Sequence, residues 1–95
     1  MEIREIQDFE DGAFVVPANN KEMIFVYRKT SFYPNFYVAL RGDGTLYFPP
    51  RNSKTRFESA RAATPLEIRY FHTALAIAGV RWNYIMKEVE NICEM

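Results

Sequence analysis

The side chains that most often do chemistry in proteins are scarce in this chain. It has one histidine, His72, and one cysteine, Cys93. A zinc site needs three or four ligands, and a serine or cysteine nucleophile needs a base within hydrogen-bond reach. No flanking motif supports either arrangement, and each of the 4 glycines fits a turn or a helix end, not a phosphate loop. We therefore expect no catalytic, metal or cofactor site, and we expect His72 to be a plain surface residue.

Two segments of the first half carry residue types that suit binding. Residues 51–61 are rich in Lys and Arg, and residues 31–37, "SFYPNFY", are rich in aromatic rings. Single-stranded nucleic acid is bound by such a combination, because cations neutralise phosphates and bases stack on rings. A solvated basic loop beside core aromatics would give the same pattern. Alternatively, a peptide groove like that of SH3-like domains could be lined by Tyr33, Tyr47, Phe48 and Pro49-Pro50. The candidate surface residues are Arg51, Lys54, Arg56, Arg61, Tyr33, Phe36 and Tyr47.

Composition and charge narrow the choice of partner. The 12 Lys and Arg residues balance the 12 Asp and Glu residues, and this weakens the nucleic-acid interpretation because such binding depends on neutralising phosphates.

A hydrophobic content of 48% indicates a folded protein, and 95 residues suit a single domain over 1–95. The lone cysteine favours a reducing compartment, the cytoplasm. The sequence shows no signal peptide and no run long enough to span a membrane, so we expect no membrane partner.

The β-rich part of the chain, about residues 9–61, has short apolar and aromatic runs separated by turn signals. In the second run, Met23, Phe25 and Tyr27 alternate with Ile24 and Val26, so each set should lie on its own face of a sheet. The expected strands are 14–16, 22–29, 36–40, 45–48 and a further short one at 56–61. They predict an α+β protein with a small antiparallel β-meander or an SH3-like barrel of four to five strands. A flat sheet covered on one face by a helix would give the same local pattern.

Residues 64–79 have the start and stop signals of a helix. Thr64 suits the N-cap, a proline follows it, and Glu67 stands three residues after the cap, where it completes a capping box. Gly79 suits the left-handed residue just beyond the helix end. We therefore expect one helix over about 65–78.

The apolar side chains of this helix form two adjacent rows. The rows are Ile68, Phe71, Leu75 and Ala78, and Leu66, Tyr70, Ala74 and Ile77. We expect this broad surface to cover the sheet and to bury Phe71, Leu75 and Trp82, while the polar face of Arg69, His72 and Thr73 stays exposed. The alternative is that the apolar surface binds a partner.

Residues 80–95 form a strand and a tail. Val80 and Trp82 alternate with polar residues, which indicates a strand after the helix. The following "IMKEVENI" has apolar residues spaced for a helix, but a turn within it would make the tail a β-hairpin. Residue spacing alone leaves both forms of the tail open.

One long segment carries a resemblance to a known group of proteins. The stretch "ATPLEIRYFHTALAIAGVRWN" (63–83) resembles a segment of small, uncharacterised proteins of gut bacteria, their phages and mobile elements. The opening "FEDGAFVV" (9–16) and the hairpin "YVALRGDGTLYF" (37–48) are similar to those of the same group. Ala13 and Val80 depart from its pattern. The resemblance implies a hairpin for the tail, with Trp82 packed against the helix, and it implies no activity.

These observations predict a small binding or accessory domain, not an enzyme, encoded by a phage or mobile element. The expected partner is another protein or a second copy of the chain. Binding of single-stranded nucleic acid through the basic loop 51–61 and the aromatics of 31–37 is the alternative.

Overall fold

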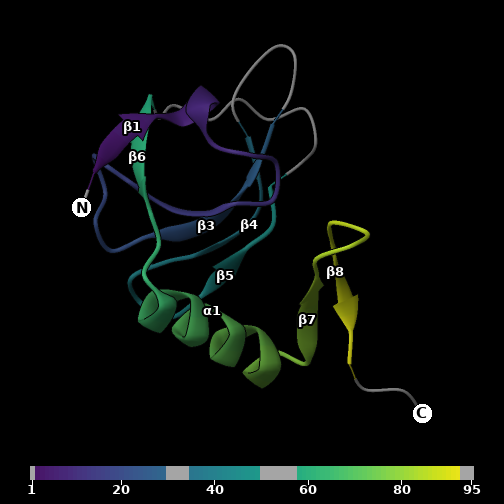
Figure 1. The fold of residues 1–95 in the computed structure, drawn as a ribbon. Helices are drawn as coiled ribbons and strands as arrows, with labels where there is room; N and C mark the ends of the chain where they lie inside the picture. The colour runs from purple at the N-terminus through teal and green to yellow at the C-terminus, as the bar shows by residue number, and fades with distance from the viewer. Residues whose placement is uncertain (1, 30–34, 50–57, 93–95) are drawn as a thin grey trace.

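The computed structural model describes residues 2–29, 35–49 and 58–92 and has the predicted α+β fold. In these residues a six-stranded antiparallel sheet and a two-stranded hairpin are joined by one α-helix (Figure 1). The elements are β1 (Ile3–Glu5), the short 3-10 helix η1 (Ile6–Asp8), β2 (Phe14–Pro17), β3 (Ile24–Arg28), β4 (Asn35–Leu40), β5 (Leu46–Tyr47), β6 (Ser59–Ala62), α1 (Pro65–Ile77), β7 (Val80–Asn83) and β8 (Glu88–Asn91).

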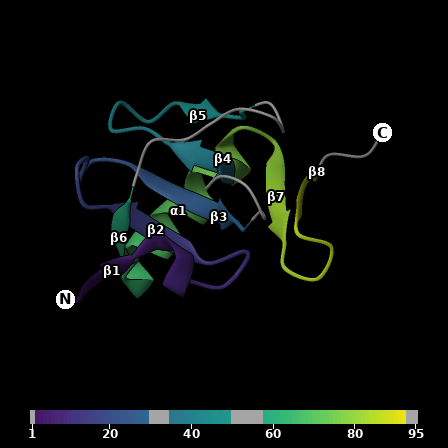
Figure 2. The same cartoon turned by 90° about the horizontal axis from the view of Figure 1, so that it is seen from above.

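The order of strands in the large sheet is β1-β6-β2-β3-β4-β5. Strands β2 to β5 form the expected meander, and β6 returns along the far edge of β2 to pair with it (Figure 2). The edge strand β1 adds a sixth strand that the sequence pattern does not indicate. Within the described residues β1 and β5 do not pair with each other, so the sheet is open and does not close into a barrel.

The two faces of the sheet bury two separate apolar clusters. On β3, Phe25 and Tyr27 lie in one cluster with residues of η1, while Ile24 and Val26 lie in the other, as the predicted alternation requires. Helix α1 and the β7–β8 hairpin cover the second face, and Phe71 contributes a ring from the helix. The side chains of both faces are therefore withdrawn from water, which suits a small domain rich in aromatic residues.

Helix α1 forms where the sequence predicts it and ends one residue earlier. The Thr64 side chain accepts a hydrogen bond from the Glu67 amide, and the Glu67 carboxylate accepts one from the Thr64 amide, so the capping box is complete. Gly79 has φ of +82°, the left-handed conformation that glycine adopts at low cost. Leu75 and Phe71 are completely buried, which confirms that this side of the helix covers the sheet.

The tail of the described chain is a β-hairpin. Strands β7 and β8 pair in register from Val80 opposite Asn91 to Asn83 opposite Glu88. Trp82 is buried in the same cluster as α1, and its ring centroid lies 5.1 Å from that of Tyr37 on β4. The hairpin interpretation and the burial of Trp82 are thus both confirmed.

Two expectations for the surface of α1 are wrong. His72 is half-buried, because its ring packs beside Phe14 of β2, and it is not a plain surface residue. In the second apolar row, Leu66, Tyr70 and Ile77 are 70%, 56% and 83% exposed. The side of the helix that faces the sheet carries Ile68, Phe71 and Leu75 of the first row and Ala74 of the second, because these positions lie close together around the helix.

Candidate protein-binding surface

The described part of the chain exposes a run of large apolar side chains at the turn of the β7–β8 hairpin. Tyr84, Ile85 and Met86 are consecutive residues with exposed fractions of 57%, 90% and 65%. We refer to these three residues as the hairpin tip. Turns usually carry Gly, Asn, Asp, Ser or Pro, so three large apolar residues here are contrary to ordinary turn chemistry. Consecutive apolar side chains exposed to water are unfavourable unless they serve a function such as contact with another molecule.

The backbone of the hairpin tip is held by the side chain of Asn83. Its Oδ1 accepts hydrogen bonds from the amides of Ile85 and Met86, each at 2.9 Å. The Lys87 amide donates to the carbonyl of Asn83 at 2.8 Å, and Lys87 has φ of 53°, which closes the turn. The apolar side chains are therefore presented on a turn whose amides are already satisfied.

Tyr84 connects the hairpin tip to helix α1. Its phenol oxygen lies 2.7 Å from Nε2 of His72. The Tyr84 and His72 rings both pack at a tilt beside Phe14 of β2, with centroid distances of 5.9 and 5.5 Å. Partial burial raises the pKa of the Tyr84 phenol, so the group keeps its proton over the physiological range. The three rings fix the near end of the turn against the body, while Ile85 and Met86 extend beyond it.

A polar cluster lies beside the turn end of the hairpin, where Gly12 neighbours the Lys87 side chain. The Tyr37 phenol donates to the Asp11 carboxylate at 3.0 Å, and the Lys29 amide donates to the same carboxylate at 2.9 Å. Burial, with a contribution from Asp11, raises the pKa of Tyr37. A bulge in the β3–β4 pairing turns Tyr37 toward this cluster, since Tyr27 pairs with Phe36 while Val26 pairs with Val38.

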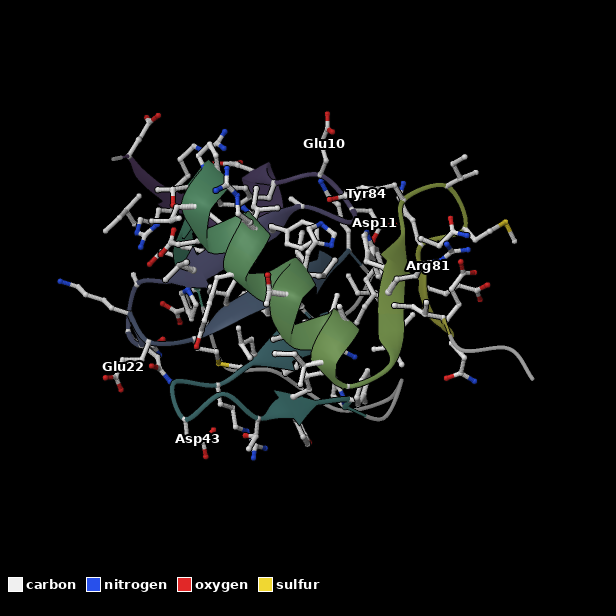
Figure 3. The ribbon with its side chains drawn as sticks, turned by 90° about the horizontal axis from the view of Figure 1, so that it is seen from below. Glu10, Asp11, Glu22, Asp43, Arg81 and Tyr84 are labelled. Carbon is white, nitrogen blue, oxygen red and sulfur yellow. The ribbon has the colours of Figure 1, made fainter. Side chains whose placement is uncertain are left out.

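The outer face of the hairpin is polar. Arg81 Nε donates to Glu90 Oε1 at 2.6 Å, and Asn83 Nδ2 donates to Glu90 Oε2 at 3.2 Å. The hydrogen bonds from Asn83 and Arg81 lower the pKa of Glu90. Figure 3 shows Arg81 and Tyr84 on this side of the molecule, with Glu22 and Asp43 on the opposite side. The hairpin tip is thus an apolar patch with polar residues behind it, an arrangement typical of protein contact surfaces.

Of the residues that the sequence singles out for nucleic-acid or peptide binding, the structure describes Phe36, Tyr47 and Arg61. Arg51, Lys54, Arg56 and Tyr33 lie outside the described residues. Phe36 is 5% exposed and packs on Phe25, with a ring-centroid distance of 5.4 Å, so its faces are not open to a base. Tyr47 is partly exposed and lies 6.0 Å from Phe36.

Arg61 stands apart from these two rings. It lies on β6, and strands β2 and β3 separate it from β4. Its guanidinium makes a two-pronged ion pair with the Glu67 carboxylate, with both N–O distances at 2.8 Å. This pairing, together with the Thr64 amide, lowers the pKa of Glu67 to about 2. The structure therefore assigns Arg61 to the start of α1, where it stabilises the helix.

Sequence reasoning missed the hairpin tip as a candidate surface. The signal was present as "NYIMKE", a run of apolar residues that follows an asparagine within a possible turn. The helix and hairpin interpretations of this stretch place the same residues differently, and only the hairpin exposes all three together. The position of Asn83 before the turn was the discriminating feature.

Comparison of the chain with protein-family models, with curated proteins and with solved structures finds no match. No helix within residues 2–29, 35–49 and 58–92 has the length and apolar character to cross a bilayer. In that same part of the chain, no three His, Cys, Asp or Glu side chains gather as metal ligands. The geometry of the described surface is therefore what supports a proposal about function.

Proposed function

We propose that this protein is a small, non-enzymatic binding or accessory domain that acts by contact with another protein through the hairpin tip. The resemblance of residues 63–83 to proteins of gut bacteria and their phages supports an origin in a phage or mobile element, and the single cysteine supports action in the cytoplasm. The partner contributes a hydrophobic pocket that receives Ile85 and Met86.

The observation that carries this proposal is the exposure of Tyr84, Ile85 and Met86 on a turn in which the Ile85 and Met86 amides are hydrogen-bonded to Asn83. Tyrosine and methionine are enriched at protein interfaces, because each buries a large area with an adaptable or amphipathic side chain. A turn with satisfied amides loses little conformational entropy on binding, so more of the contact energy appears as affinity. The tip can therefore act as a compact anchor despite its small size.

Single-stranded nucleic acid is the second candidate ligand. The observation in its favour is the Arg41 guanidinium, which lies 4.6 Å from the ring centroid of the partly exposed Tyr47. An arginine beside an exposed ring is suited to a phosphate and its neighbouring base. Binding through this pair would weaken steeply with added salt and would be lost in Tyr47→Ala.

Co-purification from the native host tests the main proposal. Tagged wild-type chain is compared with Ile85→Ser/Met86→Ser, which removes the apolar side chains and leaves Asn83 in place. A matched control, Lys21→Ser/Glu22→Ser, changes two exposed residues of the β2–β3 turn. We expect a protein that is retained by wild type and control and lost by the tip variant. Retention of the same proteins by all three chains would refute the proposal.

A further inference from the structure

Helix α1 exposes a second apolar surface that is separate from the hairpin tip. Its outward stripe consists of Leu66, Tyr70, Thr73 and Ile77. At about 100° per residue these four positions fall within about 60° of one another around the helix. The three large apolar members are mostly exposed. In Figure 3 the helix lies in front of the sheet. No described element covers the stripe.

The spacing of the stripe is symmetric about the middle of α1. Its intervals are four, three and four residues, so the pattern reads the same in both directions along the helix. A two-fold interface requires that residue i contacts residue j while j contacts i. In an antiparallel pair centred between Phe71 and His72, Leu66 of each copy would meet Ile77 of the other. Tyr70 would likewise meet Thr73. These intervals are also those of a coiled-coil seam.

The charges beside the stripe are compatible with this arrangement. The flanking charged residues, Glu67 and Arg69, both lie in the first half of the helix, and the second half carries Ala74 and Ala76. In the antiparallel pair Arg69 would stand opposite Ala74, and Glu67 opposite Ala76. Like charges therefore do not meet, and alanines allow close approach of the helices. The formal net charge of zero also removes long-range repulsion between two copies.

We propose that two copies of this chain associate through α1 as an antiparallel, two-fold symmetric pair. One outward helix face from each copy buries less than the roughly 1,200 Å² of total area found in stable complexes, so the pair is weak and forms at micromolar concentrations or above. The pair carries two hairpin tips, so a partner with repeated sites would be bound with avidity. The association is independent of the function proposed for the tip.

Sedimentation equilibrium over a range of concentrations tests the association. The weight-average mass of the wild type should rise from monomer toward dimer as concentration increases. Ile77→Lys should abolish the rise, because it sets two ammonium groups into the apolar seam. The matched control is Ile85→Lys, which changes an isoleucine of similar exposure at the hairpin tip and should leave the rise unchanged. A wild-type chain that stays monomeric at every concentration would overturn the inference.

Cross-linking tests the antiparallel geometry. Positions 66 and 77 are separated by about 16 Å along the helix, at 1.5 Å per residue. In a Cys93→Ser background, Leu66→Cys and Ile77→Cys are treated with a bismaleimide shorter than this separation. A mixture of the two variants should form a covalent dimer, and each variant alone should not. Self-linking of the single variants would indicate a parallel pair and would overturn the proposal.

The two proposals fail in different ways. If the mixed Leu66→Cys and Ile77→Cys variants form no covalent dimer, while the hairpin tip still retains a host protein, only the proposed α1 pair is overturned. A concentration-dependent dimer whose tip retains nothing would overturn only the proposed function.

Discussion

The phenol oxygen of Tyr84 and Nε2 of His72 lie 2.7 Å apart and join the hairpin to helix α1. The residues are twelve positions apart in the sequence, and both rings rest beside Phe14. This contact holds the near end of the hairpin tip against the body of the protein. It also explains why the only histidine of the chain is half-buried on a helix side that the sequence assigns to solvent.

His72→Ala should therefore lower the free energy of unfolding by about 0.5–1.5 kcal/mol, the usual net value of one hydrogen bond. Equilibrium urea unfolding measures the change. The control is Thr73→Ala, an exposed neighbour on the same helix. If the two variants were equally stable, the His72–Tyr84 contact would have no role in docking the hairpin.

Leu75→Ala should be far more costly, about 2–5 kcal/mol, because the side chain is completely buried and its removal leaves a cavity. Leu66→Ala is a matched control with the same chemistry on the same helix, at a position 70% exposed. It should change the free energy of unfolding by less than about 0.5 kcal/mol. Urea unfolding at low protein concentration compares them. Similar costs for the two leucines would mean that α1 does not cover the core.

Glu67 should make stability depend on pH in the acid range. Its ordinary pKa of 4.5 is lowered to about 2 in the folded protein, chiefly by the Arg61 guanidinium. A lowered folded-state pKa gives stability that is fully present above 4.5 and is lost as pH falls from there toward 2. Glu67→Gln preserves a residue that can complete the capping box but removes the charge. When the free energy of unfolding is measured at several acid pH values, it should fall less steeply with decreasing pH in Glu67→Gln than in the wild type. Parallel pH dependences of the two proteins would contradict this.

Asn83→Ala should release the backbone of the hairpin tip. The substitution removes the oxygen that accepts from the amides of Ile85 and Met86. A loss of about 1 kcal/mol corresponds to roughly fivefold faster exchange of these two amides with deuterium. The exposed Asn91→Ala is the control and should leave both amides unchanged. Equal exchange in the two variants would show that the turn is not held by Asn83.

Local signals in the sequence predict much of this fold. The capping box of Thr64 and Glu67, the position of Gly79 and the alternation along β3 are all confirmed, because each depends on neighbours in the chain. Strand β1 was not predicted, since its three residues are all exposed and its pairing with β6 is a contact between distant segments.

The surfaces were harder to predict than the elements. The two apolar rows of α1 are equivalent in sequence, and which row faces the sheet depends on how the helix docks in three dimensions. Likewise, Tyr84, Ile85 and Met86 would be partly buried in a helix and become a common exposed surface only in the hairpin. Long-range packing therefore determines both candidate surfaces.

Site-specific photo-cross-linking in the native host measures directly whether the hairpin tip contacts another protein. A photoreactive phenylalanine derivative is introduced in place of Ile85, and in a control chain in place of Glu22, which is exposed on the opposite side of the molecule (Figure 3). We expect a discrete covalent adduct with one host protein from position 85 and none from position 22. No adduct from position 85, or the same adducts from both positions, would contradict it.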